Sequence, residues 1–133
     1  MGFGDAVRTC FQKFFVAEGR ASRPEYWWFF LSYFILYAIA ALIDTALETG
    51  FVIAGIVGLV YLVPLITAAI RRLHDTGRSG WWYLIILIPL VGFIILIVFL
   101  ATEGNPGQNE YGPPPGTVAG GGGMVAPPPP PPA

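Results

Sequence analysis

A run of twenty uncharged residues at 51–70 constrains the fold more than any other feature of the chain. At about 1.5 Å per residue, a helix of this length can cross a hydrocarbon core of about 30 Å. Two further apolar stretches lie at about 27–43 and 81–101. With 55% hydrophobic and 11% charged residues, a soluble domain of 133 residues would expose large apolar patches to water. The sequence therefore predicts an all-α integral membrane protein with three transmembrane helices.

The N-terminal segment, residues 1–18, has a different pattern. Phe3, Val7, Phe11 and Phe14 recur at steps of three or four, with polar residues between them. This spacing predicts an amphipathic helix. Its apolar face could pack on the rest of the protein or lie in the lipid headgroup boundary. We prefer the boundary, because a predicted span follows almost at once.

The segment GRASRPEYWWF at 19–29 contains a helix start. Ser22 and Glu25 have the spacing of a capping box, in which the serine side chain accepts a hydrogen bond from the helix backbone. Pro24 is tolerated in the first turn, where its missing N–H would have no partner. A helix is therefore predicted to begin near Ser22.

The last part of the chain cannot build a core. Residues 102–112 are rich in turn formers, and residues 113–133 are dominated by glycine and proline. Such a composition predicts a disordered tail that ends in a polyproline II run. Whether that run binds a proline-recognising partner stays open. The predicted organisation is an N-terminal amphipathic segment at 1–18, a three-span membrane domain at 19–112 and the tail at 113–133.

The basic residues predict the topology. All seven lie either before the first apolar run or in the loop at 71–80, whereas the connection at 44–50 and the tail carry only acidic charges. The acidic charges of that last part are Glu103 and Glu110, in the segment from residue 102 that leads into the tail. Because cytoplasmic loops are enriched in Lys and Arg, the N-terminus and the 71–80 loop are predicted to be cytoplasmic, and the chain from residue 102 through the tail to lie outside. Four tryptophans fall at the cytoplasmic starts of the first and third spans, where indole rings favour the interface. These predicted interfacial anchors are Trp27, Trp28, Trp81 and Trp82.

Two charged segments, at 19–29 and 71–82, are predicted to face the same side of the membrane. Together they form a predicted "basic collar", which we expect to bind anionic lipid headgroups or an acidic partner segment. Asp75 is expected to pair with an arginine from 19–23 and so tie the two segments together. The collar consists of Arg20, Arg23, Arg71, Arg72, His74, Asp75 and Arg78.

Catalytic chemistry has little support in the sequence. His74 beside Asp75 is the one pair that could supply a general base. No nucleophile has a supporting motif, no second histidine offers a metal site, and Cys10 alone excludes an intrachain disulfide. We therefore predict a protein that is not an enzyme, with no catalytic residue, metal, cofactor or nucleic-acid partner.

Several uncommon motifs occur in a characteristic order. They are GRASRPEYWWF at 19–29, RRLHDTGRSGWW at 71–82, P-x-x-G at 89–92 and G-x-x-G-x-N-x-Y-G at 104–112. In these motifs, over about residues 10–114, the chain resembles the bacterial inner-membrane proteins of domain of unknown function family eight hundred and five. The resemblance implies a multi-pass protein of the bacterial plasma (inner) membrane with no established activity. Members usually carry an acidic residue between the prolines after Y-G, where this chain has the prolines at 113–115.

The resulting functional hypothesis is a non-enzymatic membrane scaffold or lipid-interacting component. Two alternatives stay open: a subunit of a transport or channel assembly, and a membrane-embedded enzyme that uses His74 and Asp75. The expected partner is the lipid bilayer, including anionic headgroups. A second membrane protein or a second copy of the chain stays open as well.

Overall fold

The computed structural model describes residues 2–115 and is built from helices. Apart from an isolated bridge between Asn109 and Gly112, the regular structure of this part of the chain is helical, which confirms the predicted all-α class. Of the predicted tail, residues 116–133 lie outside the described part. The helices are α1 (Phe3–Gln12), α2 (Arg23–Leu47), α3 (Val52–Asp75), the 3₁₀ helix η1 (Gly80–Leu87) and α4 (Val91–Ala101).

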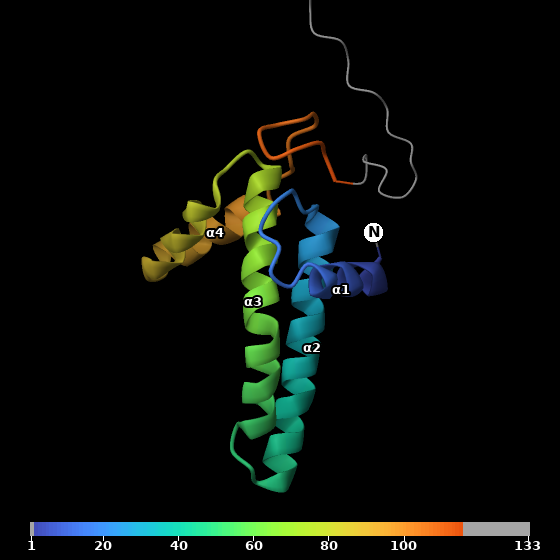
Figure 1. Ribbon diagram of the computed structural model, residues 1–133. Coiled ribbons are helices and arrows are strands. Elements are labelled where there is room, and N and C mark those ends of the chain that lie inside the picture. Colours follow the sequence, from blue (N-terminus) through green and yellow to red (C-terminus); the bar gives the residue numbers. More distant parts are fainter. Residues whose placement is uncertain (1, 116–133) are drawn as a thin grey trace, which may run out of the picture.

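Helices α2 and α3 form a long antiparallel pair that organises the molecule (Figure 1). Both are long and apolar enough to cross a membrane. In the view of Figure 1, α1 lies across one side of the pair, and η1 and α4 project from the other side. Most of the remaining chain therefore lies around one end of the pair, where α2 begins and α3 ends.

Both long helices extend beyond the predicted spans at 27–43 and 51–70. Asp44, expected in the connection, lies inside α2, and its carboxylate caps the start of α3. Its Oδ1 accepts a hydrogen bond from Ile53 N at 3.0 Å, and its Oδ2 accepts one from Ala54 N at 2.8 Å. These contacts satisfy two N–H groups that have no intrahelical partner. The turn between the helices is therefore shorter than predicted.

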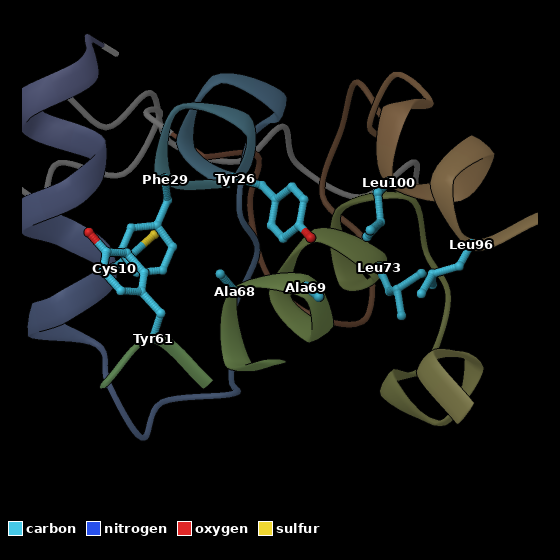
Figure 2. Close-up of a cluster of buried hydrophobic side chains, with 9 residues drawn as sticks. All are labelled: Cys10, Tyr26, Phe29, Tyr61, Ala68, Ala69, Leu73, Leu96 and Leu100. Carbon is cyan, nitrogen blue, oxygen red and sulfur yellow. The ribbon is translucent and has the colours of Figure 1, made fainter. Parts of the chain in front are cut away.

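Helix α1 packs on the long pair through its aromatic face. Phe11 meets the ring of Phe29 at 5.2 Å and that of Tyr61 at 5.1 Å, both edge-on. Figure 2 shows Cys10 of α1 beside Phe29 and Tyr61 in the buried core. The predicted helix at 1–18 is present but ends at Gln12, and Thr67 Oγ1 donates to Phe14 O at 3.1 Å where the chain leaves α1. Of the two interpretations of this helix, the packing on the protein is thus observed.

The stretch 81–101, predicted as a third span, is not a single helix. The stretch forms η1, a break at residues 88–90, and the short helix α4. Pro89 supplies no backbone N–H, and Leu90 adopts a positive φ of 62°, so the helix cannot continue through the break. The chain reverses there, and α4 packs back against η1. Uniform apolar composition, which predicted a span, carries no signal for this reversal.

Candidate functional site

The charged ends of α2 and α3 meet in a cluster of buried ion pairs. The side chains of Arg71 and Arg72 are fully buried, and Arg20 is 6% exposed. Two carboxylates, both nearly buried, balance them. We call this group the ion-pair cluster, and its members are Arg20, Glu25, Arg71, Arg72 and Asp75.

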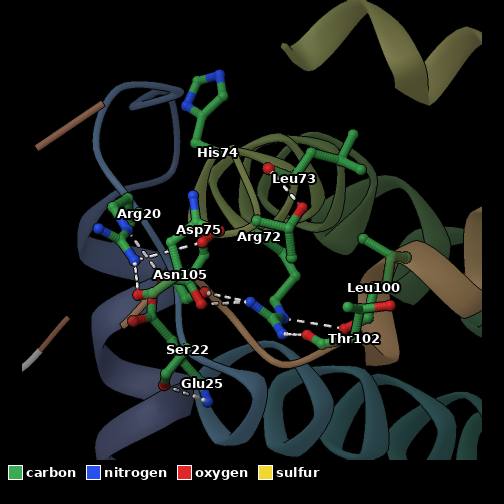
Figure 3. A network of polar contacts seen from close by, with 12 residues as sticks. Arg20, Ser22, Glu25, Arg72, Leu73, His74, Asp75, Leu100, Thr102 and Asn105 are labelled. Carbon is green, nitrogen blue, oxygen red and sulfur yellow. Dashed lines mark hydrogen bonds and ion pairs between the residues drawn. The ribbon is translucent and has the colours of Figure 1, made fainter. Parts of the chain in front are cut away.

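Asp75, at the end of α3, is shared by two arginines. Its Oδ1 accepts a hydrogen bond from Arg20 Nε at 2.9 Å, and its Oδ2 accepts one from Arg72 Nη1 at 2.5 Å (Figure 3). Arg72 precedes Asp75 by three residues and so lies on the same helix face. Arg20 comes from the segment before α2. The expected pairing of Asp75 with an arginine from 19–23 is therefore present.

Arg20 also holds the segment that follows α4. Its Nη1 donates to Gly107 O at 2.8 Å and to Gly112 O at 3.0 Å. Its Nη2 donates to Asn105 O at 2.6 Å and to Asp75 O at 3.3 Å. All five N–H donors of a guanidinium can thus be satisfied at this one side chain.

Arg72 performs the same role at the end of α4. Its Nε donates to Leu100 O at 2.9 Å, and its Nη2 donates to Thr102 O. Its Nη1 also reaches Ala21 O at 3.2 Å. The last carbonyls of a helix lack intrahelical partners and carry partial negative charge, so a cation there is favourable. Arg72 thereby fixes the end of α4 beside the start of α2.

Arg71 points to the other side of α3, toward α1. Its Nη1 pairs with Glu25 Oε2, and its Nη2 lies 3.9 Å from Cys10 Sγ. Cys10 Sγ also lies 4.0 Å from Glu25 Oε2. Burial, and then the charge of Glu25, raise the pKa of the Cys10 thiol to about 11. Within the described residues, Arg71 Nε has no hydrogen-bond partner.

His74 is turned away from Asp75. Its Nδ1 lies 3.0 Å from Gly19 O, and its ring stacks on Tyr111 with 3.9 Å between centroids and a 2° angle between planes. Asn109 Nδ2 donates to His74 O at 2.9 Å. The carboxylate that a catalytic pair would need is already held by two arginines. His74 therefore anchors the chain around Gly19 and the loop at 109–111 to the end of α3.

The segment at 104–112 fits tightly against Asp75. Asn105 N donates to Asp75 O at 2.7 Å. A Cβ added to Gly104 would overlap the Asp75 carboxylate, so only glycine permits this approach. The motif that follows α4 thus completes the cluster formed by the two earlier motifs.

The seven residues of the predicted basic collar differ in how deeply they are buried. Arg20, Arg71, Arg72 and Asp75 are buried, so the prediction of an open binding surface is wrong for them. Their charges are neutralised within the protein, because an unpaired buried charge is costly. Of the remaining three, His74 and Arg78 are half-buried and Arg23 is exposed. Arg78 lies over the Phe99 ring at 4.0 Å from its centroid.

The four predicted tryptophan anchors lie around the same end of the molecule. Trp27 is partly buried and donates from Nε1 to Leu100 O at 3.3 Å. Trp28, Trp81 and Trp82 are exposed, and Trp81 reaches 79% exposure. Ser22 is the N-cap of α2, and its Oγ accepts a hydrogen bond from Glu25 N at 3.2 Å. The Glu25 side chain turns to Arg71 instead of returning to the cap.

An open groove lies beside the start of α2. It has a volume of about 460 Å³ and combines one cation with aromatic and aliphatic side chains. None of the ion pairs among residues 2–115 involves that cation, Arg23. The groove is lined by Arg23, Pro24, Trp27, Trp28 and Leu31.

Metal binding has no support in the described part of the chain. Among residues 2–115, no group of three or more His, Cys, Asp or Glu side chains is placed to hold a metal ion. The acidic side chains of the ion-pair cluster face arginines instead.

The sequence interpretation missed the third component of the cluster. The topology predicted from the basic residues places Gly104, Asn105, Tyr111 and Gly112 on the opposite side of the membrane from Arg20 and His74. The available signal is that these residues belong to the distinctive motif G-x-x-G-x-N-x-Y-G at 104–112. Cys10, for which the sequence only excludes an intrachain disulfide, lies beside Glu25 and Arg71 of the cluster.

Comparisons with known proteins identify the family. The model described as Protein of unknown function (DUF805) matches residues 14–113. Inner membrane protein YhaH of Escherichia coli (strain K12) is 43% identical over 103 residues, which cover 72% of this chain and 84% of the relative. Inner membrane protein YhaI of the same strain is 43% identical over 96 residues, covering 71% and 81%. No solved structure matches the chain at a significant level. The chain is therefore a membrane protein that belongs to the DUF805 family.

Proposed function

We propose that this chain is a non-enzymatic component of the bacterial inner membrane that holds an anionic phospholipid at its cytoplasmic face. The observation that carries the proposal is the exposed Arg23 above an apolar groove. The buried arginines of the family motifs already have partners within the protein. Within the described part of the chain, Arg23 forms no ion pair and can meet a negatively charged group from outside.

The groove matches the two parts of a phospholipid. Arg23 offers a guanidinium for the phosphate, and Trp28 and Leu31 continue the groove along α2 with apolar surface for an acyl chain. The start of α2 also carries the positive end of the helix dipole, which favours an anion nearby. A headgroup at Arg23 would lie beside the exposed indole of Trp28, which lines the same groove.

The proposed orientation follows from the basic residues. The N-terminal segment and the loop at 71–80 face the cytoplasm, because all seven Lys and Arg residues lie there. The connection between α2 and α3 faces the opposite side and carries Asp44 and Glu48. Cytoplasmic leaflets contain anionic lipids, which agrees with a cation at this end of α2.

The proposal of a non-enzymatic role rests on the contacts that already hold both candidate catalytic groups, His74 and Asp75. Asp75 accepts hydrogen bonds from two arginines, and the His74 ring lies against Gly19 O and Tyr111. Neither group is directed to a common reacting atom.

Lipid retention tests the proposal. We would purify the wild-type chain, Arg23→Gln and Lys13→Gln from membranes in a mild detergent and measure bound phosphatidylglycerol and cardiolipin by mass spectrometry. Since one basic residue near an anionic lipid contributes about 1 kcal/mol, Arg23→Gln should lower retention about fivefold. Lys13 is a cation of the same N-terminal part of the chain that does not line the groove, so Lys13→Gln should retain wild-type amounts. Equal retention by all three proteins would refute the lipid site.

A further inference from the structure

The geometry points to a re-entrant hairpin: η1 and α4 enter and leave the bilayer from the same side, with acyl chains of one leaflet around them. In this arrangement the chain crosses the membrane twice, through α2 and α3. Residues 102–112 then lie on the side that holds the ion-pair cluster.

The first observation is that the hairpin begins and ends at the same end of α3. Helix η1 starts at Gly80, shortly after α3 ends at Asp75. The end of α4 returns there, since Leu100 O accepts hydrogen bonds from Arg72 Nε at 2.9 Å and Trp27 Nε1 at 3.3 Å. The far end of α3, at Val52, is roughly 36 Å away by helix rise. Helix α4 therefore finishes on the side where η1 begins.

The second observation is the length of the two arms. The eight residues of η1 span about 16 Å at 2.0 Å per residue, and the eleven residues of α4 span about 16 Å at 1.5 Å per residue. The hydrocarbon core of a bilayer is about 30 Å thick. Each arm is therefore too short to cross the core, and both arms project sideways from the long α2–α3 pair (Figure 1), which suits a hairpin within one leaflet.

The third observation is how the backbone reverses. Backbone polar groups at membrane depth need partners within the protein. Ile88 N donates to Ile85 O at 3.0 Å, and Gly92 N donates to Ile88 O at 3.1 Å. Pro89 has no N–H to satisfy. Backbone N–H groups at the bend, which lies outside regular helix, thus find carbonyl partners within the hairpin.

Gly92 shows that the arms cross closely. A Cβ added to Gly92 would overlap Ile85 O on the opposite arm. Such close approach explains a glycine at this position. In a straight span, Ile85 and Gly92 would be two turns apart on one helix and a methyl group at 92 would meet no such obstacle.

The outer surface of the hairpin suits acyl chains. No charged residue occurs from Gly80 to Ala101, and Leu87, Leu90 and Phe93 are exposed. Helices α2 and α3 also carry exposed apolar residues, among them Leu42 and Leu59. Polar groups that favour the interface stand only at its base, where Arg78 lies over Phe99 and Trp81 is exposed.

Site-directed labelling decides between the two topologies. In a Cys10→Ala chain we would introduce Glu18→Cys, Thr49→Cys or Gln108→Cys, each at an exposed position outside the apolar helices. A membrane-impermeant maleimide is applied to spheroplasts and to inverted vesicles. The hairpin predicts that Gln108→Cys labels with Glu18→Cys and that Thr49→Cys labels from the opposite side. Labelling of Gln108→Cys together with Thr49→Cys would overturn the proposal.

A glycine pair tests the crossing itself and needs no engineered cysteine. Gly92→Ala should reduce the yield of monodisperse protein in detergent several-fold, because the added Cβ overlaps the backbone of η1. Gly58→Ala, in apolar α3, is the matched control, since a Cβ there meets no atom within 4 Å. A Gly92→Ala protein with the yield of Gly58→Ala would refute the close crossing. Both outcomes are independent of lipid retention at Arg23.

Discussion

Asp75 joins segments of the chain that are far apart in sequence. Its two carboxylate oxygens bind Arg20 from before α2 and Arg72 from α3, and its backbone carbonyl binds Asn105 from after α4. The side chain is 6% exposed, so water contributes little to balancing the charges. The ion-pair cluster therefore fixes the segment before α2 and the segment after α4 at the end of α3.

Removal of the Asp75 charge should destabilise the protein strongly. Asp75→Asn keeps the shape of the side chain but leaves two buried guanidiniums without their shared counter-charge, which costs about 3–5 kcal/mol. The measurement is thermal unfolding of the purified protein in detergent. Glu110→Gln, at an exposed carboxylate, should change stability by less than about 0.5 kcal/mol. Similar unfolding temperatures for the two variants would contradict the role assigned to Asp75.

The reactivity of Cys10 should depend steeply on pH. Burial raises the pKa of its thiol from 9.0 to about 11, so the reactive thiolate is roughly a hundredfold scarcer at pH 8 than for an ordinary thiol. The rate of alkylation by iodoacetamide should therefore be low at pH 8 and rise as pH approaches 11. Cys10→Ala with Glu18→Cys provides an exposed thiol for comparison. Fast labelling of native Cys10 at pH 8 would show that α1 leaves the core.

At the scale of elements, side-chain contacts fix one end each of α2, α3 and α4. Ser22 caps α2, and Arg72 binds the last carbonyls of α4. Asp44 binds two N–H groups at the start of α3 although it lies in α2. The capping of α2 was readable from Ser22 and Glu25, because that contact is local in sequence. The other two contacts join separate elements, so no local sequence pattern predicts them.

The cap at Asp44 makes a prediction for the α2–α3 pair. Asp44→Ala removes both acceptors and should cost about 1–2 kcal/mol in the free energy of unfolding. Chemical or thermal unfolding in detergent would measure this loss. Glu48→Gln is the matched control, since Glu48 is an exposed acidic residue in the same turn. An Asp44→Ala protein as stable as Glu48→Gln would show that the cap is dispensable.

At the scale of the whole molecule, the sequence predicted the helical class, the two long helices and a link from Asp75 to an arginine of 19–23, which the structure shows to be Arg20. It failed at 81–101, because two half-length apolar arms have the same composition and total length as one full span. That single error also put Gly104 and Tyr111 on the wrong side of Arg20. The sequence also did not predict the burial of Arg71 and Arg72, since adjacent arginines at a helix end usually face lipid headgroups.

The partners of Arg20 have a consequence for synthesis of the chain. Its Nη1 binds carbonyls that lie 87 and 92 residues later, at Gly107 and Gly112. While the ribosome is still producing α4, these acceptors do not yet exist, and a buried donor without a partner costs about 1–3 kcal/mol. Arg20 therefore makes the stability of the first helices depend on the last described loop. A chain that stops early would be less stable than a complete one, and proteases that survey the membrane could distinguish the two.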